Sequence, residues 1–217
     1  MTQPPLRACL HHAVALSFLA LFSVSQVSLA GEGIERDPHE YFFTQSFGDL
    51  PEEMEEAKKS GKQGMLLFFQ AEACPYCEYM LNHIFNQKDV QDWFGERFVS
   101  LSVDIHGDVE LKDFDGITLP SKVFANQRRV HITPLISFID HDAVEVYRHY
   151  GMIKTVDEFL LIGEYIDGKH YYDTEYRVFS ESRGLAQPGG ALVSSAAATD
   201  HPDANQKPPE RREEEPD

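Results

Sequence analysis

Residues 69–77 read Phe-Gln-Ala-Glu-Ala-Cys-Pro-Tyr-Cys, directly after an apolar run that begins at Met65. Beyond them, from Cys77 to Ile84, apolar residues recur at the i, i+3, i+4 and i+7 spacing of one helix face. The order is therefore strand, short turn, Cys-Pro-Tyr-Cys and helix. A Cys-x-x-Cys pair in that context predicts a redox-active dithiol, formed by Cys74 and Cys77.

The chain is strongly acidic. Its 217 residues hold 19 Lys and Arg against 36 Asp and Glu, which gives a formal net charge of -17 at pH 7. Nucleic acids and anionic lipids bind surfaces of the opposite sign, so the charge argues against both as partners. We attribute it to solubility. The length fits one domain with appendages, and the hydrophobic share of 42% is enough for an ordinary packed core.

The cysteine count supports a chemical role for the pair. The chain has three cysteines, and Cys9 lies in a segment that we expect to be removed. The remaining two, Cys74 and Cys77, would close a very small loop. Such a loop removes little entropy from the unfolded chain, so the pair is a poor structural cross-link.

Residues 1–30 have the pattern of a secretory signal peptide. One charged residue, Arg7, precedes an apolar run from Ala13 to Val24, and Ser28-Leu29-Ala30 places small residues at the positions that signal peptidase inspects. We expect cleavage after Ala30 and export to the periplasm. The alternative is an uncleaved membrane anchor, but the run is shorter than the ~20 residues that span a bilayer.

The chain divides into four segments. After the signal peptide, residues 31–48 are rich in aromatic side chains, so we expect an N-terminal extension packed on the domain. Residues 49–181 form the folded domain with a C-terminal extension. Residues 182–217 are dominated by Gly, Ala, Ser, Pro and acidic residues without apolar periodicity, which predicts a disordered tail.

The folded domain has a readable order of helices and strands. Asp49 is positioned as a helix cap, with Glu52 three residues later, and Gly61 ends that helix. Residues 105–119 are acidic and rich in Asp and Gly, and we expect a loop. The remaining expected elements are strands at 65–69, 98–103, 135–139 and 143–147, and helices from Cys74, at 89–95, at 120–127 and from Thr155.

This order predicts an α/β fold. The first two strands are joined through helices and should be parallel, whereas the last two should form an antiparallel hairpin. The result is a mixed four-stranded sheet with helices on both faces.

The chain resembles the thioredoxin-fold superfamily over roughly residues 49–170. The resemblance is carried by Cys-Pro-Tyr-Cys at 74–77, by Asp-Phe-Asp-Gly at 113–116 and by the Thr133-Pro134 pair. It is closest to the exported SoxW-type thioredoxin-like proteins. Cys-Pro-Tyr-Cys is also the dithiol of glutaredoxins, but the glutathione-binding pattern of that family is not evident.

The motif assigns different roles to its two cysteines. Cys74, at the N-terminal end of a helix, would be held as a thiolate by unpaired N–H groups and the helix dipole, and is the expected nucleophile. Cys77, one turn on, would resolve the mixed disulfide. Pro75 and Tyr76 set the turn and tune the potential. The alternative is half of a zinc site, or a copper-binding pair with Met80, but no second Cys-x-x-Cys exists.

The resemblance implies that Pro134 is cis and faces the dithiol. The backbone of its neighbour Thr133 would then pair with the substrate chain as an added strand. The alternative is an ordinary trans proline that opens an edge strand. His131 is either a residue of the same groove or a merely packed or solvated side chain.

The sequence also departs from the family. Thioredoxins carry a buried Asp six residues before the first cysteine, and this chain has Phe68 there; Gln70 and Ala73 replace the flanking Trp residues. Proton transfer must therefore differ. Glu72 and Glu78 are candidates for it, and solvated surface acids are the alternative reading.

Together these features predict an exported thiol–disulfide oxidoreductase that reduces disulfides in periplasmic client proteins. By analogy, its electrons would come from an inner-membrane thiol transporter. We expect a monomer without a bound cofactor or metal, since the Cys74–Cys77 disulfide itself carries the electrons. The alternatives are a disulfide oxidase or isomerase, and a non-catalytic module that holds clients or a metal.

Overall fold

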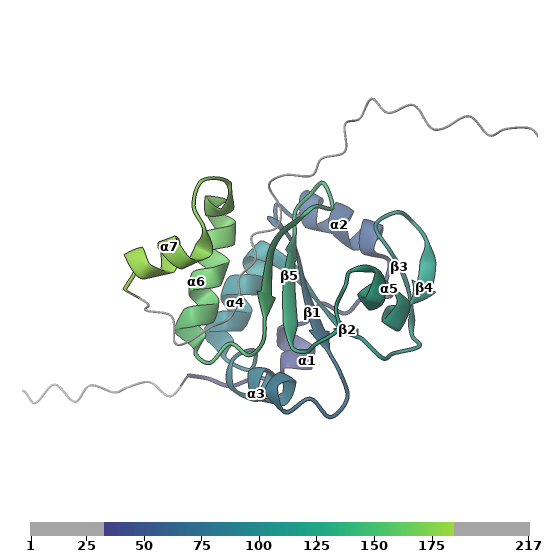
Figure 1. Ribbon diagram of the computed structural model, residues 1–217, viewed down its shortest axis with the longest axis horizontal. Helices are drawn as coiled ribbons and strands as arrows, with labels where there is room; N and C mark the ends of the chain where they lie inside the picture. The colour runs from purple at the N-terminus through teal and green to yellow at the C-terminus, as the bar shows by residue number, and fades with distance from the viewer. Residues whose placement is uncertain (1–32, 185–217) are drawn as a thin grey trace, which may run out of the picture. The chain divides into compact units, whose positions relative to one another are not determined.

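The computed structural model describes residues 33–184, and Figure 1 shows the arrangement of its elements. The expected signal peptide, its cleavage after Ala30 and nearly all of the expected tail lie outside the described residues. The elements are α1 (Pro38–Tyr41), α2 (Leu50–Lys59), β1 (Gly64–Gln70), α3 (Pro75–His83), α4 (Lys88–Arg97), β2 (Phe98–Asp104), β3 (Glu110–Lys112), β4 (Thr118–Pro120), α5 (Ser121–Gln127), β5 (Leu135–Ile139), β6 (Glu145–Tyr150), α6 (Val156–Asp167), the short 3-10 helix η1 (His170–Tyr172) and α7 (Tyr176–Ser182).

The four long strands form one mixed sheet in the order β2-β1-β5-β6. β1 is parallel to β2 and antiparallel to β5, and β5 and β6 form an antiparallel hairpin. The predicted α/β fold with a mixed four-stranded sheet is confirmed. β1 lies inside the sheet, and six of its seven residues are buried, which explains the unbroken apolar run before the cysteines.

Helices cover both faces of the sheet, and each face has its own apolar cluster. The cluster on one face joins side chains of α3, α4, α6 and α7 to alternate residues of the strands. The cluster on the other face joins α2, α5 and the β3–β4 hairpin. In Figure 1 the helices α4 and α6 lie on one side of the sheet, and α2 and α5 on the other.

Two helices begin at the capping residues that the sequence predicts. The Asp49 carboxylate accepts a hydrogen bond from the Glu52 backbone N–H (3.1 Å), and α2 then buries Leu50, Met54 and Ala57. The Thr155 hydroxyl likewise accepts from the Glu158 N–H (3.2 Å) at the start of α6.

We expected a plain loop at residues 105–119, and this prediction is wrong. It contains the two-stranded sheet of β3 and β4, which pair antiparallel. The Asp113 carboxylate closes the turn between them by accepting from the N–H groups of Asp115 and Ile117. Strands of three residues are too short to produce a readable alternation, so the pattern was missed.

The return strand of the last hairpin is shifted from its predicted position. The hairpin itself is correct, but β6 spans Glu145–Tyr150 and not residues 143–147. The Asp140 carboxylate accepts from the N–H groups of Asp142 and Val144, and Ala143 adopts a left-handed conformation with φ 61°. These contacts lengthen the turn by two residues.

The segment after α6 packs back onto the domain. Tyr176 and Phe179 of α7 are buried, and Tyr176 meets Tyr147 of β6 and Tyr165 of α6 at centroid distances of 5.5 and 5.4 Å. Because α7 covers α6 from a second side, α6 buries Leu161 and Ile162 as well as Phe159. Among residues 33–184, no helix has both the length and the apolar character needed to cross a membrane.

Candidate active site

The two cysteines of the motif are joined in a disulfide. Their sulfur atoms are 2.10 Å apart, and their Cα atoms 5.2 Å apart. Cys74 is the N-cap residue of α3, and Pro75 occupies the first turn. Proline is favoured there because the missing N–H would have had no partner in the helix. Ala73, which precedes the cap, has φ 58° and turns the chain from β1 into α3.

The start of α3 places a backbone donor on the first sulfur. The Cys77 N–H donates to the Cys74 Sγ (3.2 Å), as an N-cap oxygen would accept in an ordinary helix. After reduction, this N–H and the positive end of the helix would both favour a thiolate on Cys74. The local geometry therefore supports Cys74 as the nucleophile.

Solvent exposure also favours Cys74 over Cys77 as the reactive residue. Cys77 is 2% exposed and Cys74 is 9% exposed. The two residues between them face outward, and Tyr76 is 60% exposed. Cys74 and Tyr76 can therefore be reached from solvent, whereas Cys77 is more deeply buried.

Pro134, which the resemblance places opposite the dithiol, lies in the segment before β5. Phe69 of β1 is paired with Leu135 of β5, so Pro134 lies beside the turn that leads from β1 to Cys74. The Thr133–Pro134 peptide bond is cis, and the Pro134 carbonyl accepts from the Gly151 N–H (2.9 Å). Pro134 is buried, Thr133 is half-buried, and His131 is exposed.

The apolar cluster that contains the two cysteines is rich in aromatic side chains, which form an aromatic floor for the dithiol. Phe68 is fully buried in the same apolar cluster as Cys77. Its ring lies 5.9 Å from that of Phe43 and 4.9 Å from that of Phe85, and Phe42 stacks on Phe85 at 4.4 Å. This apolar surrounding disfavours an ionised Cys77 thiol after reduction.

The two candidate acids for proton transfer are not part of this aromatic cluster. Glu72 and Glu78 are both exposed, and neither forms an ion pair within residues 33–184. Their role in proton transfer stays a prediction.

No motif in the sequence assigns Phe42, Phe43 and Phe85 to the site. The aromatic content of residues 31–48 indicated packing but carried no signal of the partner. In the structure Phe42 stacks on Phe85 and Phe43 stacks on Phe68, and the Arg36 N–H donates to the Asn86 carbonyl (2.8 Å) beyond the end of α3. The extension therefore contributes to the apolar cluster that also contains the two cysteines.

The described residues 33–184 contain no group of three or more His, Cys, Asp or Glu side chains placed to hold a metal ion. Met80, the candidate copper ligand, is fully buried in the apolar cluster. His83 is exposed and lies against Tyr79 at a ring distance of 4.6 Å.

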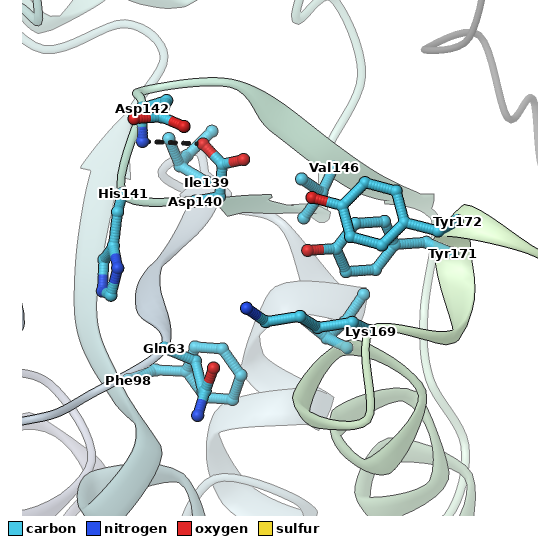
Figure 2. A pocket seen from close by; sticks show the side chains of 11 residues that line it. Gln63, Phe98, Ile139, Asp140, His141, Asp142, Val146, Lys169, Tyr171 and Tyr172 are labelled. Carbon is cyan, nitrogen blue, oxygen red and sulfur yellow. Dashed lines mark hydrogen bonds between the residues drawn. The ribbon is translucent and has the colours of Figure 1, made fainter.

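A separate small cavity lies at the other end of the sheet. It measures about 140 Å³ and is lined by Gln63, Lys169 and Tyr171 among others. Figure 2 shows the Lys169 side chain reaching into it, toward Gln63. Gln63 precedes β1, whereas Cys74 follows it, and a strand of this length separates the two by about 20 Å. This cavity is thus distant from the dithiol.

The chain belongs to the thioredoxin-like domain family, which matches residues 50–167, more than half of its length. Among solved structures, a thioredoxin-fold protein from Helicobacter pylori is 22% identical and has a TM-score of 0.52, covering 67% of this chain and 93% of that protein. A thioredoxin from Thermus thermophilus is 27% identical with a TM-score of 0.39, covering 52% and 78% of the two chains. No curated protein matches the chain.

Proposed function

We propose that the protein is a thiol–disulfide oxidoreductase. The observation that carries the proposal is the Cys74–Cys77 disulfide at the start of α3, with the Cys77 N–H directed at the more accessible sulfur. A structural cross-link would gain little from so short a loop, but a nucleophile gains reactivity from this position.

The proposed reaction starts from the reduced dithiol. The Cys74 thiolate attacks one sulfur of a client disulfide, a Cys74–client bond forms, and the second client sulfur leaves as a thiolate that takes a proton from water. Cys77 then loses its proton to solvent, with Glu72 and Glu78 as candidate acceptors, and attacks the Cys74 sulfur. The mixed disulfide breaks, and its client sulfur leaves as a thiolate that also takes a proton from water. The client has gained two electrons and two protons, and the Cys74–Cys77 disulfide is restored.

Client binding would use the wall opposite the cysteines. Pro134 lies beside the motif turn, and the Thr133 backbone is available to pair with an extended client segment. Tyr76 and Pro75, both exposed, would contact the client from the helix side. Protein substrates with disulfides are the partners that such an arrangement fits.

We infer further that the enzyme is an exported reductase of the SoxW type. The signal-peptide pattern of residues 1–30 supports export, with cleavage after Ala30 and action in the periplasm. An inner-membrane thiol transporter would then supply the electrons to a monomeric protein. The extension at residues 31–48 and the tail at residues 182–217 would flank the catalytic domain.

Two measurements test the proposal. The protein should accelerate insulin reduction by dithiothreitol, and Cys74→Ser should abolish the effect. The equilibrium potential of the Cys74–Cys77 pair against glutathione should lie near the thioredoxin value of about -270 mV. A potential near the -120 mV of strong oxidants would indicate an oxidase. Inactivity in the insulin assay would indicate a non-catalytic client-holding module.

A further inference from the structure

A groove of about 600 Å³ runs along the dithiol helix. One wall is residues 35–39 of the N-terminal extension, and the other is α3 with the turn that follows it. The groove is shallow and widely open to solvent. The matched family region begins at residue 50, so the first wall is a feature of this chain outside that region.

The groove starts within one helical turn of the nucleophile. Its α3 wall includes Glu78, Leu81 and Asn82, which follow Cys74 by four, seven and eight residues. Residues at these spacings share one face of a helix. The α3 side of the groove therefore lies about 6 to 12 Å along the helix axis from Cys74. A client segment held at Cys74 can continue into it.

Hydrogen bonds fix the wall formed by residues 35–39 of the N-terminal extension. The Arg36 N–H donates to the Asn86 carbonyl and the Lys88 N–H donates to the Ile34 carbonyl, both at 2.8 Å. The Arg36 guanidinium is bound by Asp92 (2.5 Å) and Gln91 (2.6 Å). These bonds fix the backbone of the wall without using its acidic side chains.

The charges that remain in the groove are negative. Glu35, Asp37 and Glu78 are exposed, and none forms an ion pair with another described residue. The one guanidinium in the lining, that of Arg36, is paired with Asp92, which also pairs with Lys88, so three unpaired carboxylates face one cation that shares its counter-ion. Leu81 and Pro38 add apolar surface between the carboxylates. Lysine and arginine match this pattern, because their aliphatic stems pack on apolar surface while their charged ends remain solvated.

We propose that this groove binds a lysine- or arginine-rich segment of the client protein, next to the client's disulfide. The proposal rests on the proposed oxidoreductase function. It specifies that function, since it selects clients whose disulfide is flanked by basic residues. The charge complementarity would also raise the rate of encounter, and this effect would weaken with salt.

The test separates binding from catalysis. The full chain is titrated with a fluorescent lysine-rich peptide that contains no cysteine, and with the same peptide carrying glutamate at each lysine position. The variant combines Glu35→Gln with Asp37→Asn. Asparagine retains the N-cap acceptor that Asp37 offers to the His39 N–H (2.8 Å), so α1 should persist. The matched control combines Glu56→Gln with Glu110→Gln, two exposed acids of α2 and β3 on the other face of the sheet.

The groove variant should weaken binding of the basic peptide by about fivefold or more, and the control by less than twofold, because exposed charge pairs contribute modestly and locally. High salt should reduce the difference. Equal weakening by variant and control would refute the site, as would equal affinity for the acidic peptide. Failure of the protein to reduce insulin would refute only the oxidoreductase function, because this binding measurement involves no thiol.

Discussion

The ring of Phe43 stacks on the ring of Phe68, with centroids 5.9 Å apart and planes 24° from parallel. Phe43 belongs to the N-terminal extension, and Phe68 to the central strand, six residues before Cys74. The extension therefore supplies part of the apolar floor of the dithiol, at the position where thioredoxins carry a buried acid.

Phe43→Ala should destabilise the domain substantially. The side chain is 7% exposed, and its removal loses apolar burial and leaves a cavity under β1. We expect a loss of about 3 kcal/mol in the free energy of unfolding, measured by urea titration. Phe47→Ala is the matched control, because Phe47 lies four residues away and is fully exposed. If Phe43→Ala lowers the free energy of unfolding no more than Phe47→Ala does, Phe43 is not part of the core.

The two cysteine variants should differ in the species that they trap. Cys77→Ser leaves the nucleophile without its resolving partner, so mixed disulfides with clients should accumulate on Cys74. Cys74→Ser should trap few, because Cys77 is only 2% exposed. The check is non-reducing electrophoresis followed by mass spectrometry after acid quenching. If the Cys77→Ser protein accumulates none, the two-cysteine mechanism is wrong.

His149 should make the fold sensitive to acid. Burial lowers the pKa of His149 to about 4, from an ordinary value of 6.5, because the charged imidazole is desolvated in the core. Below pH 6.5 the unfolded chain takes up this proton and the folded chain does not. Stability is therefore lost as pH falls from 6.5 toward 4, by about 3 kcal/mol in total.

The His149 effect can be isolated by substitution. His149→Gln should flatten the dependence of unfolding free energy on pH between 7 and 4. His83→Gln, which changes an exposed histidine on α3, is the matched control. Parallel curves for wild type and His149→Gln would contradict the assignment of the acid sensitivity to this residue.

Two neighbouring tyrosines, Tyr147 of β6 and Tyr165 of α6, should respond oppositely to loss of the hydroxyl. The Tyr147 hydroxyl is buried without a hydrogen-bond partner among the described residues, so Tyr147→Phe should be neutral or raise stability by up to about 1 kcal/mol. The Tyr165 hydroxyl donates to the Thr174 carbonyl (2.7 Å), and Tyr165→Phe should cost about 1 kcal/mol. Thermal unfolding of both variants measures the difference. A loss of stability in Tyr147→Phe would indicate that its hydroxyl has a partner in solution.

Much of the fold was predictable because its signals are local. The apolar run before Cys74, the cap at Asp49 and the hairpin around Asp140 each depend on residues close together in the chain. The β3–β4 hairpin was missed because its strands are too short to alternate visibly. The shift of β6 escaped prediction because it depends on how the Asp140 carboxylate closes the turn.

The candidate site was predictable in part for the same reason. Cys74 and Cys77 are read from one motif, and Pro134 came from resemblance to a family. The aromatic floor was not predictable, since Phe43 and Phe68 are 25 residues apart and hydrophobicity indicates burial without naming a partner.

The sequence alone determined that the chain turns from a buried strand into a helix through Cys-Pro-Tyr-Cys, because strand, turn and helix start are set by neighbouring residues. Only the tertiary structure decided what surrounds that turn. The extension folds back beneath β1 and along α3, where burial of Phe42 and Phe43 and the backbone bonds of Arg36 and Lys88 hold it. These contacts join segments distant in sequence, so they exist only once the sheet and its helices have assembled.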